Sequence, residues 1–133
     1  MTSPRWNLLA AALSLGLAAP AFAQEASQTR AVVLTGKQER VAHHFLARKD
    51  CTAAPRPNLR LLEPAKHGTV TLRPAMVKTN SIAGCPGLEA PAVLVLYQSR
   101  QGYEGSDSIR YEVKSDTGQA QAVSVSIDVE PGS

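Results

Sequence analysis

The sequence predicts an all-β sandwich of about seven short strands. Apolar and polar residues alternate strictly over residues 107–114 and 123–129, which is the period of a strand with one face on a core and one in water. Turn-forming glycine, proline and aspartate residues recur about every 8–12 residues, as in sandwiches. No part of the sequence after the N-terminal segment shows a convincing amphipathic helix. An eight-stranded closed barrel is the alternative architecture.

The first 23 residues have the pattern of a signal peptide. Arg5 precedes an apolar stretch over residues 8–19, and the segment ends in an A-x-A pattern at Ala23. Cleavage there leaves residues 24–133 as a single domain with no further membrane-spanning stretch, so we expect an exported protein, periplasmic or secreted. A retained membrane anchor is the alternative, which is disfavoured because the apolar run is short.

Charge and composition exclude a nucleic-acid surface. The formal net charge is +3, charges of both signs are interspersed, and aromatic residues make up 5% of the chain. A nucleic-acid surface needs a concentrated basic patch with rings that stack on bases. A mixed, solvated surface is therefore the expectation, and nucleic acid is not an expected partner.

The pattern places strands between turn signals. The expected strands are residues 31–35, 41–46, 59–61, 69–73, 92–97, 107–113 and 123–129. In the second of these, Val41, His43 and Phe45 are expected on one face, with a short helix over residues 39–48 as the alternative. Residues 74–91 contain three prolines and two glycines and are expected to form an irregular insertion.

The expected core follows from the inward positions of these strands. It consists of Val70, Leu72, Val93, Val95, Tyr97, Tyr103, Ile109, Tyr111, Val113, Val123, Val125 and Ile127.

Cys51 and Cys85 are the two cysteines of the chain. In an exported protein an isolated pair usually forms one disulfide, which would stabilise the fold by about 3–4 kcal/mol. A redox-active pair is the alternative, but it favours Cys-x-x-Cys spacing. The sequence therefore predicts a structural bridge.

Several motifs carry a family resemblance that covers roughly residues 59–129. The two longest are P-x-x-H-G-T-V-T-L over residues 64–72 and G-Y-x-G-x-D-S-I-x-Y-x-V over residues 102–113, and they are joined by Tyr97, D-x-G over residues 116–118 and V-x-V-x-I-x-V over residues 123–129. Together they resemble the cadherin-like and bacterial Ig-like repeats of large exported adhesins. The resemblance implies an Ig-like Greek-key β-sandwich of about seven antiparallel strands, used for adhesion or binding. Its motif residues, expected to be structural, are Pro64, His67, Gly68, Gly102, Tyr103, Gly105, Asp107 and Tyr111.

The resemblance implies a non-enzymatic module that binds a protein or glycan at the cell envelope. This chain differs from the repeats because it holds one unit and inserts residues 75–91, where a bridge from Cys51 would fasten a loop. The residues of this possible binding loop are Lys78, Asn80, Gly84, Pro86, Gly87 and Leu88. A small secreted protease inhibitor that presents residues 84–88 is an alternative function.

Metal, cofactor and enzyme functions are not predicted. His43 and His44 are neighbours, and neighbouring side chains on a strand point to opposite faces, so they cannot share an ion without a bulge. Calcium needs six or more oxygen ligands, and the aspartates are isolated, so Asp107 is interpreted as an aspartate that bonds backbone amides in a turn. The chain has no hydrolase motif. A metal-binding periplasmic protein remains a further alternative.

Overall fold

The computed structural model describes Gly16 and residues 27–132. The predicted signal peptide therefore lies, apart from Gly16, outside the described residues. The described chain forms seven strands, and no helix long and apolar enough to cross a membrane is found in it. The strands are β1 (Ser27–Leu34), β2 (Gln38–His44), β3 (Asn58–Glu63), β4 (Gly68–Thr79), β5 (Leu88–Ser99), β6 (Gly105–Lys114) and β7 (Ala120–Glu130).

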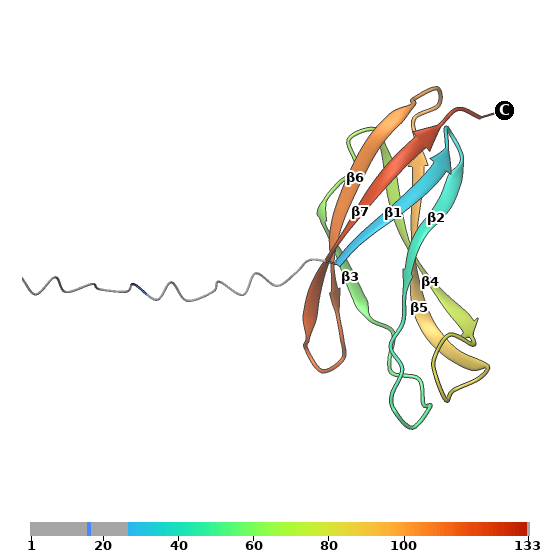
Figure 1. Ribbon diagram of the computed structural model, residues 1–133, viewed down its shortest axis with the longest axis vertical. Coiled ribbons are helices and arrows are strands. Elements are labelled where there is room, and N and C mark those ends of the chain that lie inside the picture. The colour runs from blue at the N-terminus through green and yellow to red at the C-terminus, as the bar shows by residue number, and fades with distance from the viewer. Residues whose placement is uncertain (1–15, 17–26, 133) are drawn as a thin grey trace, which may run out of the picture.

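The strands form two sheets that face each other as layers (Figure 1). The four-stranded sheet has the order β1-β7-β6-β3, and the three-stranded sheet has the order β2-β5-β4. The chain crosses between the sheets at the β1–β2, β2–β3, β3–β4 and β5–β6 connections, which gives the strand distribution of an Ig-like Greek-key sandwich. The predicted fold class is confirmed.

One pairing differs from the antiparallel arrangement that was expected. β1 lies at the edge of the four-stranded sheet and runs parallel to β7, with Ser27 opposite Val123 and Leu34 opposite Glu130. All other strand pairings are antiparallel. Alternation along a strand shows which side chains face the core but not the direction of the neighbouring strand, so the sequence pattern could not show this parallel pair.

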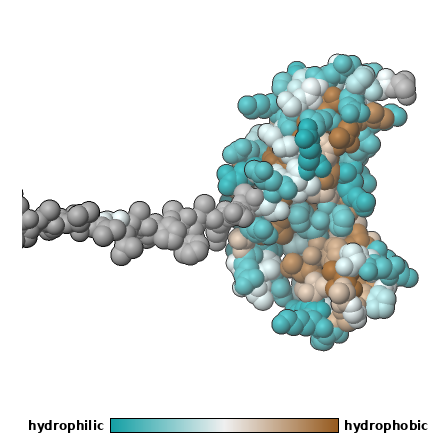
Figure 2. Space-filling model, in the orientation of Figure 1, coloured by the Kyte–Doolittle hydropathy of each residue, from teal (hydrophilic) through white to brown (hydrophobic). Residues whose placement is uncertain are grey.

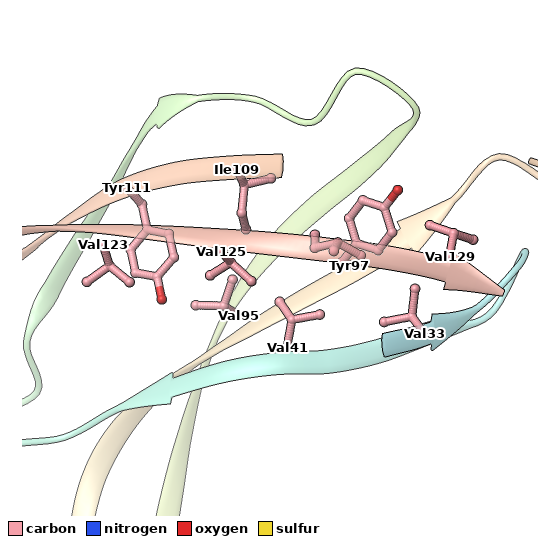
Figure 3. Close-up of a cluster of buried hydrophobic side chains, with 10 residues drawn as sticks. Val33, Val41, Val95, Tyr97, Ile109, Tyr111, Val123, Val125 and Val129 are labelled. Atoms are coloured by element: carbon pink, nitrogen blue, oxygen red, sulfur yellow. The ribbon is translucent and has the colours of Figure 1, made fainter. Parts of the chain in front are cut away.

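The core lies between the two sheets, where side chains of β1, β6 and β7 meet those of β2 and β5 (Figure 3). Eight of the expected core residues are buried: Val93, Val95, Tyr97, Ile109, Tyr111, Val123, Val125 and Ile127. The other four, Val70, Leu72, Tyr103 and Val113, are partly buried against them. The core also contains Val33, Val41 and Val129.

A bulge in β2 corrects the predicted phase of that strand. Arg40 pairs with Leu96 of β5, and Ala42 pairs with the adjacent Val95. Val41 is therefore an extra residue on the β2 side. Val41 is buried and Ala42 packs against the core, whereas His43 is exposed. The prediction that Val41 and His43 share a face is therefore wrong, because the bulge reverses the alternation between them.

The irregular insertion predicted over residues 74–91 is also wrong. β4 and β5 are paired without interruption from Gly68 opposite Ser99 to Thr79 opposite Leu88, so only residues 80–87 form a loop. Pro74 lies on β4, an edge strand, where a missing N–H can face away from the neighbour. Pro91 lies on β5 beyond the last residue paired with β2, Val93. Both prolines therefore fit into strands.

Tyr111→Ala should lower the free energy of unfolding by about 3–5 kcal/mol, because a fully buried ring is removed from the core. Tyr111→Phe is the matched control, since it keeps the ring and loses only the hydroxyl contact with His44, a cost of about 1 kcal/mol. Urea unfolding measures both changes. A loss below about 1 kcal/mol for the alanine variant would contradict the burial of this ring.

Candidate functional site

The carboxylate of Asp107 connects three segments of the chain. It is 8% exposed and lies near the start of β6. Its oxygens accept hydrogen bonds from the backbone N–H groups of Lys66 and His67, both at 3.0 Å. They also accept bonds from the Ser108 N–H at 2.8 Å and from the Tyr97 hydroxyl at 2.8 Å. The interpretation of Asp107 as an aspartate that bonds backbone amides is confirmed.

These hydrogen bonds set the ionisation of the Asp107 carboxyl group. Burial by itself raises its pKa, but the bonds from Lys66, Tyr97, Ser108 and His67 favour the charged form and hold the pKa below its usual value. Burial and the bond to Asp107 also raise the pKa of Tyr97. At neutral pH the pair is thus a carboxylate that accepts a bond from a neutral phenol.

His67 is held in place on both sides of its ring. The ring stacks on that of Tyr103, with centres 4.1 Å apart and planes 9° apart. The guanidinium of Arg100 donates to Nδ1 of His67 at 3.0 Å. The Tyr103 hydroxyl donates to the backbone oxygen of Ser106 at 2.6 Å. His67 is therefore part of a packed corner that joins the β3–β4 and β5–β6 connections.

Gly68 occupies a position in this corner where no side chain fits. A Cβ atom there would lie 2.4 Å from the backbone oxygen of Gln98 and 2.8 Å from the ring of Tyr97. Gly102 and Gly105 have φ angles of 83° and 128°, in the region that favours glycine. Pro64 is exposed after β3, and Tyr111 lies in the core. The motif residues on which the family resemblance rests therefore have structural roles.

The predicted disulfide between Cys51 and Cys85 is present, with the Cα atoms 5.3 Å apart. It fastens the β2–β3 connection to the loop at residues 80–87. Cys51 is exposed and has a φ of 64°, a left-handed conformation that costs a non-glycine residue free energy, whereas Cys85 is buried. The bridge holds the far end of the β4–β5 hairpin against the rest of the chain.

The residues of the possible binding loop lie together at this end, but they are not equally accessible. The side chains of Lys78, Asn80 and Pro86 are exposed. Leu88 is 8% exposed, so its side chain offers little surface to a partner. The side-chain oxygen of Asn80 accepts a bond from the Gly87 N–H at 2.7 Å. Gly84 and Gly87 have φ angles of 76° and 66°.

This geometry does not favour a protease-inhibitor loop. Such a loop has to present a side chain to the specificity pocket of a protease, and the largest side chain of residues 84–88 is the buried Leu88.

The neighbouring residues His43 and His44 have different surroundings. Nε2 of His44 lies 2.5 Å from the hydroxyl of Tyr111, and burial followed by the neighbouring His43 lowers the pKa of His44. Burial also raises the pKa of Tyr111 to about 12. His43 is exposed and its ring is parallel to that of Phe45, with centres 6.0 Å apart. In residues 27–132 and Gly16, no three or more potential metal-binding side chains form a group.

On the outer face of the four-stranded sheet, the arginine side chains are paired with carboxylates. Three ion pairs lie across its strands: Arg30 with Asp128 at 2.8 Å, Arg60 with Glu112 at 3.7 Å, and Arg110 with Glu63 at 3.8 Å. A surface hollow of about 860 Å³ lies on the same face, where Ser106, Ser108 and Ser126 lie beside the first of these pairs. The arginines of this face are thus already compensated by carboxylates.

The outer face of the three-stranded sheet has a different character. Val95 and Tyr97 of β5 point into the core, so Leu94, Leu96 and Gln98 point outwards. Their register partners on β2 and β4 share that face. The rows are Gln38–Gln98–Thr69, Arg40–Leu96–Thr71 and His43–Leu94–Arg73, and we call these nine residues the basic face.

The cations of the basic face have no acidic partners. None of its rows contains Asp or Glu, and among the described residues no carboxylate lies within 4.0 Å of Arg40 or Arg73. Leu96 is 6% exposed, so the side chains around it cover it. This face could not be predicted from the sequence, because Arg40 and Arg73 are far apart in the chain and share a face only through the register of their strands with β5.

Exposed apolar residues do not define a competing site. Figure 2 shows hydrophilic residues over much of one side of the molecule, with hydrophobic residues in smaller patches. The large apolar side chains that are exposed come from β1, β3 and β4: Val32, Leu61, Leu62 and Met76. Scattered exposure of this kind is normal for a folded protein.

No protein-family model and no curated protein matches the chain. Among solved structures, a solution structure of Amebosin is similar at a TM-score of 0.43 and 10% sequence identity. The similarity covers 76% of this chain and 88% of that one.

Asp107→Asn should destabilise the protein by about 1.5–3 kcal/mol at pH 7, because the charged acceptor is lost. The folded-state pKa lies below the unfolded value of about 3.9, so the contribution of Asp107 is present above that value and is lost as the pH falls through the folded-state pKa. The stability difference between wild type and variant should therefore shrink in acid. Urea unfolding from pH 7 to pH 2.5 measures it, with Asp116→Asn in the β6–β7 turn as control, because that change removes only an ion pair with Arg48 at the surface, worth about 0–1 kcal/mol. A difference that does not depend on pH would contradict this role.

Replacing both cysteines by alanine should lower the free energy of unfolding by about 3–4 kcal/mol, because the unfolded chain gains conformational freedom. Mass analysis of the oxidised protein should show a loss of two hydrogens relative to the reduced chain. Equal stability of the two proteins, or thiols that react with an alkylating reagent before reduction, would count against the bridge.

Proposed function

We propose that this chain is an exported, non-enzymatic Ig-like module that binds a protein or glycan of the cell envelope, in the periplasm or outside the cell. The observation that carries the proposal is the contrast between the two outer faces of the sandwich. One face pairs its arginines with carboxylates, and the basic face does not. Uncompensated guanidinium groups on a rigid sheet favour the docking of an anionic partner.

The composition of the basic face supports docking. Arginine is enriched in binding interfaces because its planar group donates several hydrogen bonds in a fixed geometry. Arg40 and Arg73 are exposed, and the partly exposed Leu94 lies between their strands on β5, whereas Leu96 is covered. The face therefore presents two arginines and several polar side chains around one accessible apolar side chain. The sheet beneath them is central to the fold, so little conformational entropy is lost on binding.

The polar groups buried in the sandwich support a non-enzymatic role. Asp107 and Tyr97 bond each other, and His44 bonds Tyr111. Each of these titratable groups therefore has a structural partner. Export is supported by the leader-like N-terminal sequence and by the disulfide. The resemblance of residues 59–129 to adhesin repeats supports the same role.

Two double variants test the proposal with equal changes in net charge. Arg40→Gln/Arg73→Gln removes the two arginines of the basic face, and Arg60→Gln/Arg110→Gln removes two from the ion-paired face. The immobilised oxidised protein should retain an envelope component that the first variant loses by about tenfold or more, while the second keeps it. Protease treatment of the extract shows whether that component is a protein or a glycan.

Three results would overturn the proposal. The first is no saturable retention by the wild-type protein, and the second is equal loss in both variants, which would show an effect of bulk charge alone. The third is steady conversion of the retained component by the protein, which would show an enzyme.

A further inference from the structure

The basic face continues into a hollow that adds two more cations. A hollow of about 330 Å³ is lined by Thr69 and Gln98, which belong to the basic face, by Arg100 directly after β5, and by Lys66 in the β3–β4 connection. Both added residues are exposed, and no carboxylate of the described chain lies within 4.0 Å of either cation. We call Arg73, Arg40, Lys66 and Arg100 the cationic track.

The cationic track has the form of an elongated site. It follows β5 from Leu94, which lies beside Arg73, to Arg100, and these six steps span about 20 Å at 3.4 Å per residue. Arg40 and Arg73 stand on opposite sides of β5, two strand spacings apart across the sheet and two residues apart along it, which is about 12 Å. A single small anion cannot meet all four cations over this length. A polymer with repeated negative charges can.

The groups between the cations fit a polymer rich in hydroxyl groups. Glutamine side chains at positions 38 and 98 and threonine side chains at positions 69 and 71 can both donate and accept hydrogen bonds, as sugar hydroxyls do. His43 belongs to the last row, and its ring is parallel to that of Phe45, so the two rings offer a flat surface of the kind that packs on sugar rings. The planar guanidinium group of arginine can donate two parallel hydrogen bonds to one carboxylate or sulfate group.

The site fits a peptide less well. An extended peptide gains most of its affinity by adding to the edge of a sheet, where backbone groups are free. The cationic track lies over the face of β5, which is the central strand of its sheet and hydrogen-bonds to β2 and β4. A ligand on this face can therefore be recognised by side chains alone.

On these grounds we infer that the ligand of the cationic track is an acidic polysaccharide, which lies along β5 with its negative groups on Arg73, Arg40, Lys66 and Arg100. This inference rests on the proposed binding function and names the chemical class of the ligand.

Titration of the oxidised protein with chain-length-defined oligogalacturonates tests the inference, followed by calorimetry or fluorescence anisotropy. Affinity should rise with chain length until the oligomer covers the track and should weaken with added salt, since exposed charges are screened. Arg40→Gln/Arg73→Gln should weaken binding by about tenfold or more, and Lys66→Gln should weaken long oligomers more than short ones. Arg60→Gln/Arg110→Gln should leave it unchanged.

Comparison ligands separate the alternatives. Neutral dextran of matched length and poly-glutamate should both bind at least about tenfold more weakly than the oligogalacturonate. Equal binding of dextran would overturn the inference by showing that the charges are not used. Equal or tighter binding of poly-glutamate would overturn it in favour of an acidic protein partner.

The failure of the inference can be told apart from the failure of the proposed function. If wild-type protein retains an envelope component through Arg40 and Arg73 but binds neither oligogalacturonate nor a sulfated polysaccharide such as chondroitin sulfate, the inference is wrong and the binding function stands. If the envelope component is not retained either, both are wrong.

Discussion

The Asp107 carboxylate is the interaction on which the rest of the structure depends. It accepts bonds from a strand of each sheet and from the turn between β3 and β4, so one buried charge fixes how the two layers meet at this end. A buried charge is tolerated only when it is fully bonded. The close approach at Gly68 and the stack of His67 on Tyr103 complete the same corner. The corner in turn positions Arg100 and Lys66 at the end of the cationic track.

The parts of the fold that follow from local pattern could be predicted from the sequence. The alternation over residues 107–113 and 123–129 places Ile109, Tyr111, Val125 and Ile127 in the core, as the structure does. Local pattern does not show where the alternation slips. The bulge at Val41 adds one residue to β2 and reverses the inward or outward direction of every later side chain of that strand. No residue type in β2 indicates that a bulge occurs there.

The prediction of an irregular insertion over residues 74–91 rested on their proline content, and it was wrong for a related reason. Proline excludes a strand only where its nitrogen would face a neighbour. Whether a neighbour is present depends on the order of strands in the sheet, which is a property of the whole fold. The basic face was missed in the same way, because its rows are defined by register across three strands. The motif over residues 102–113 was visible in the sequence, but its residues serve the corner and not the candidate site.

The parallel pairing of β1 with β7 has a consequence for the order of folding. The first strand completes its sheet only against the last one, with Ser27 beside Val123. A contact between the two ends of a domain closes the largest possible loop, and folds rich in such contacts form slowly. A chain that emerges N-terminus first, from a ribosome or from a translocation pore, therefore cannot close this sandwich until its final strand is free. Because of this topology, the partly emerged chain cannot complete its four-stranded sheet.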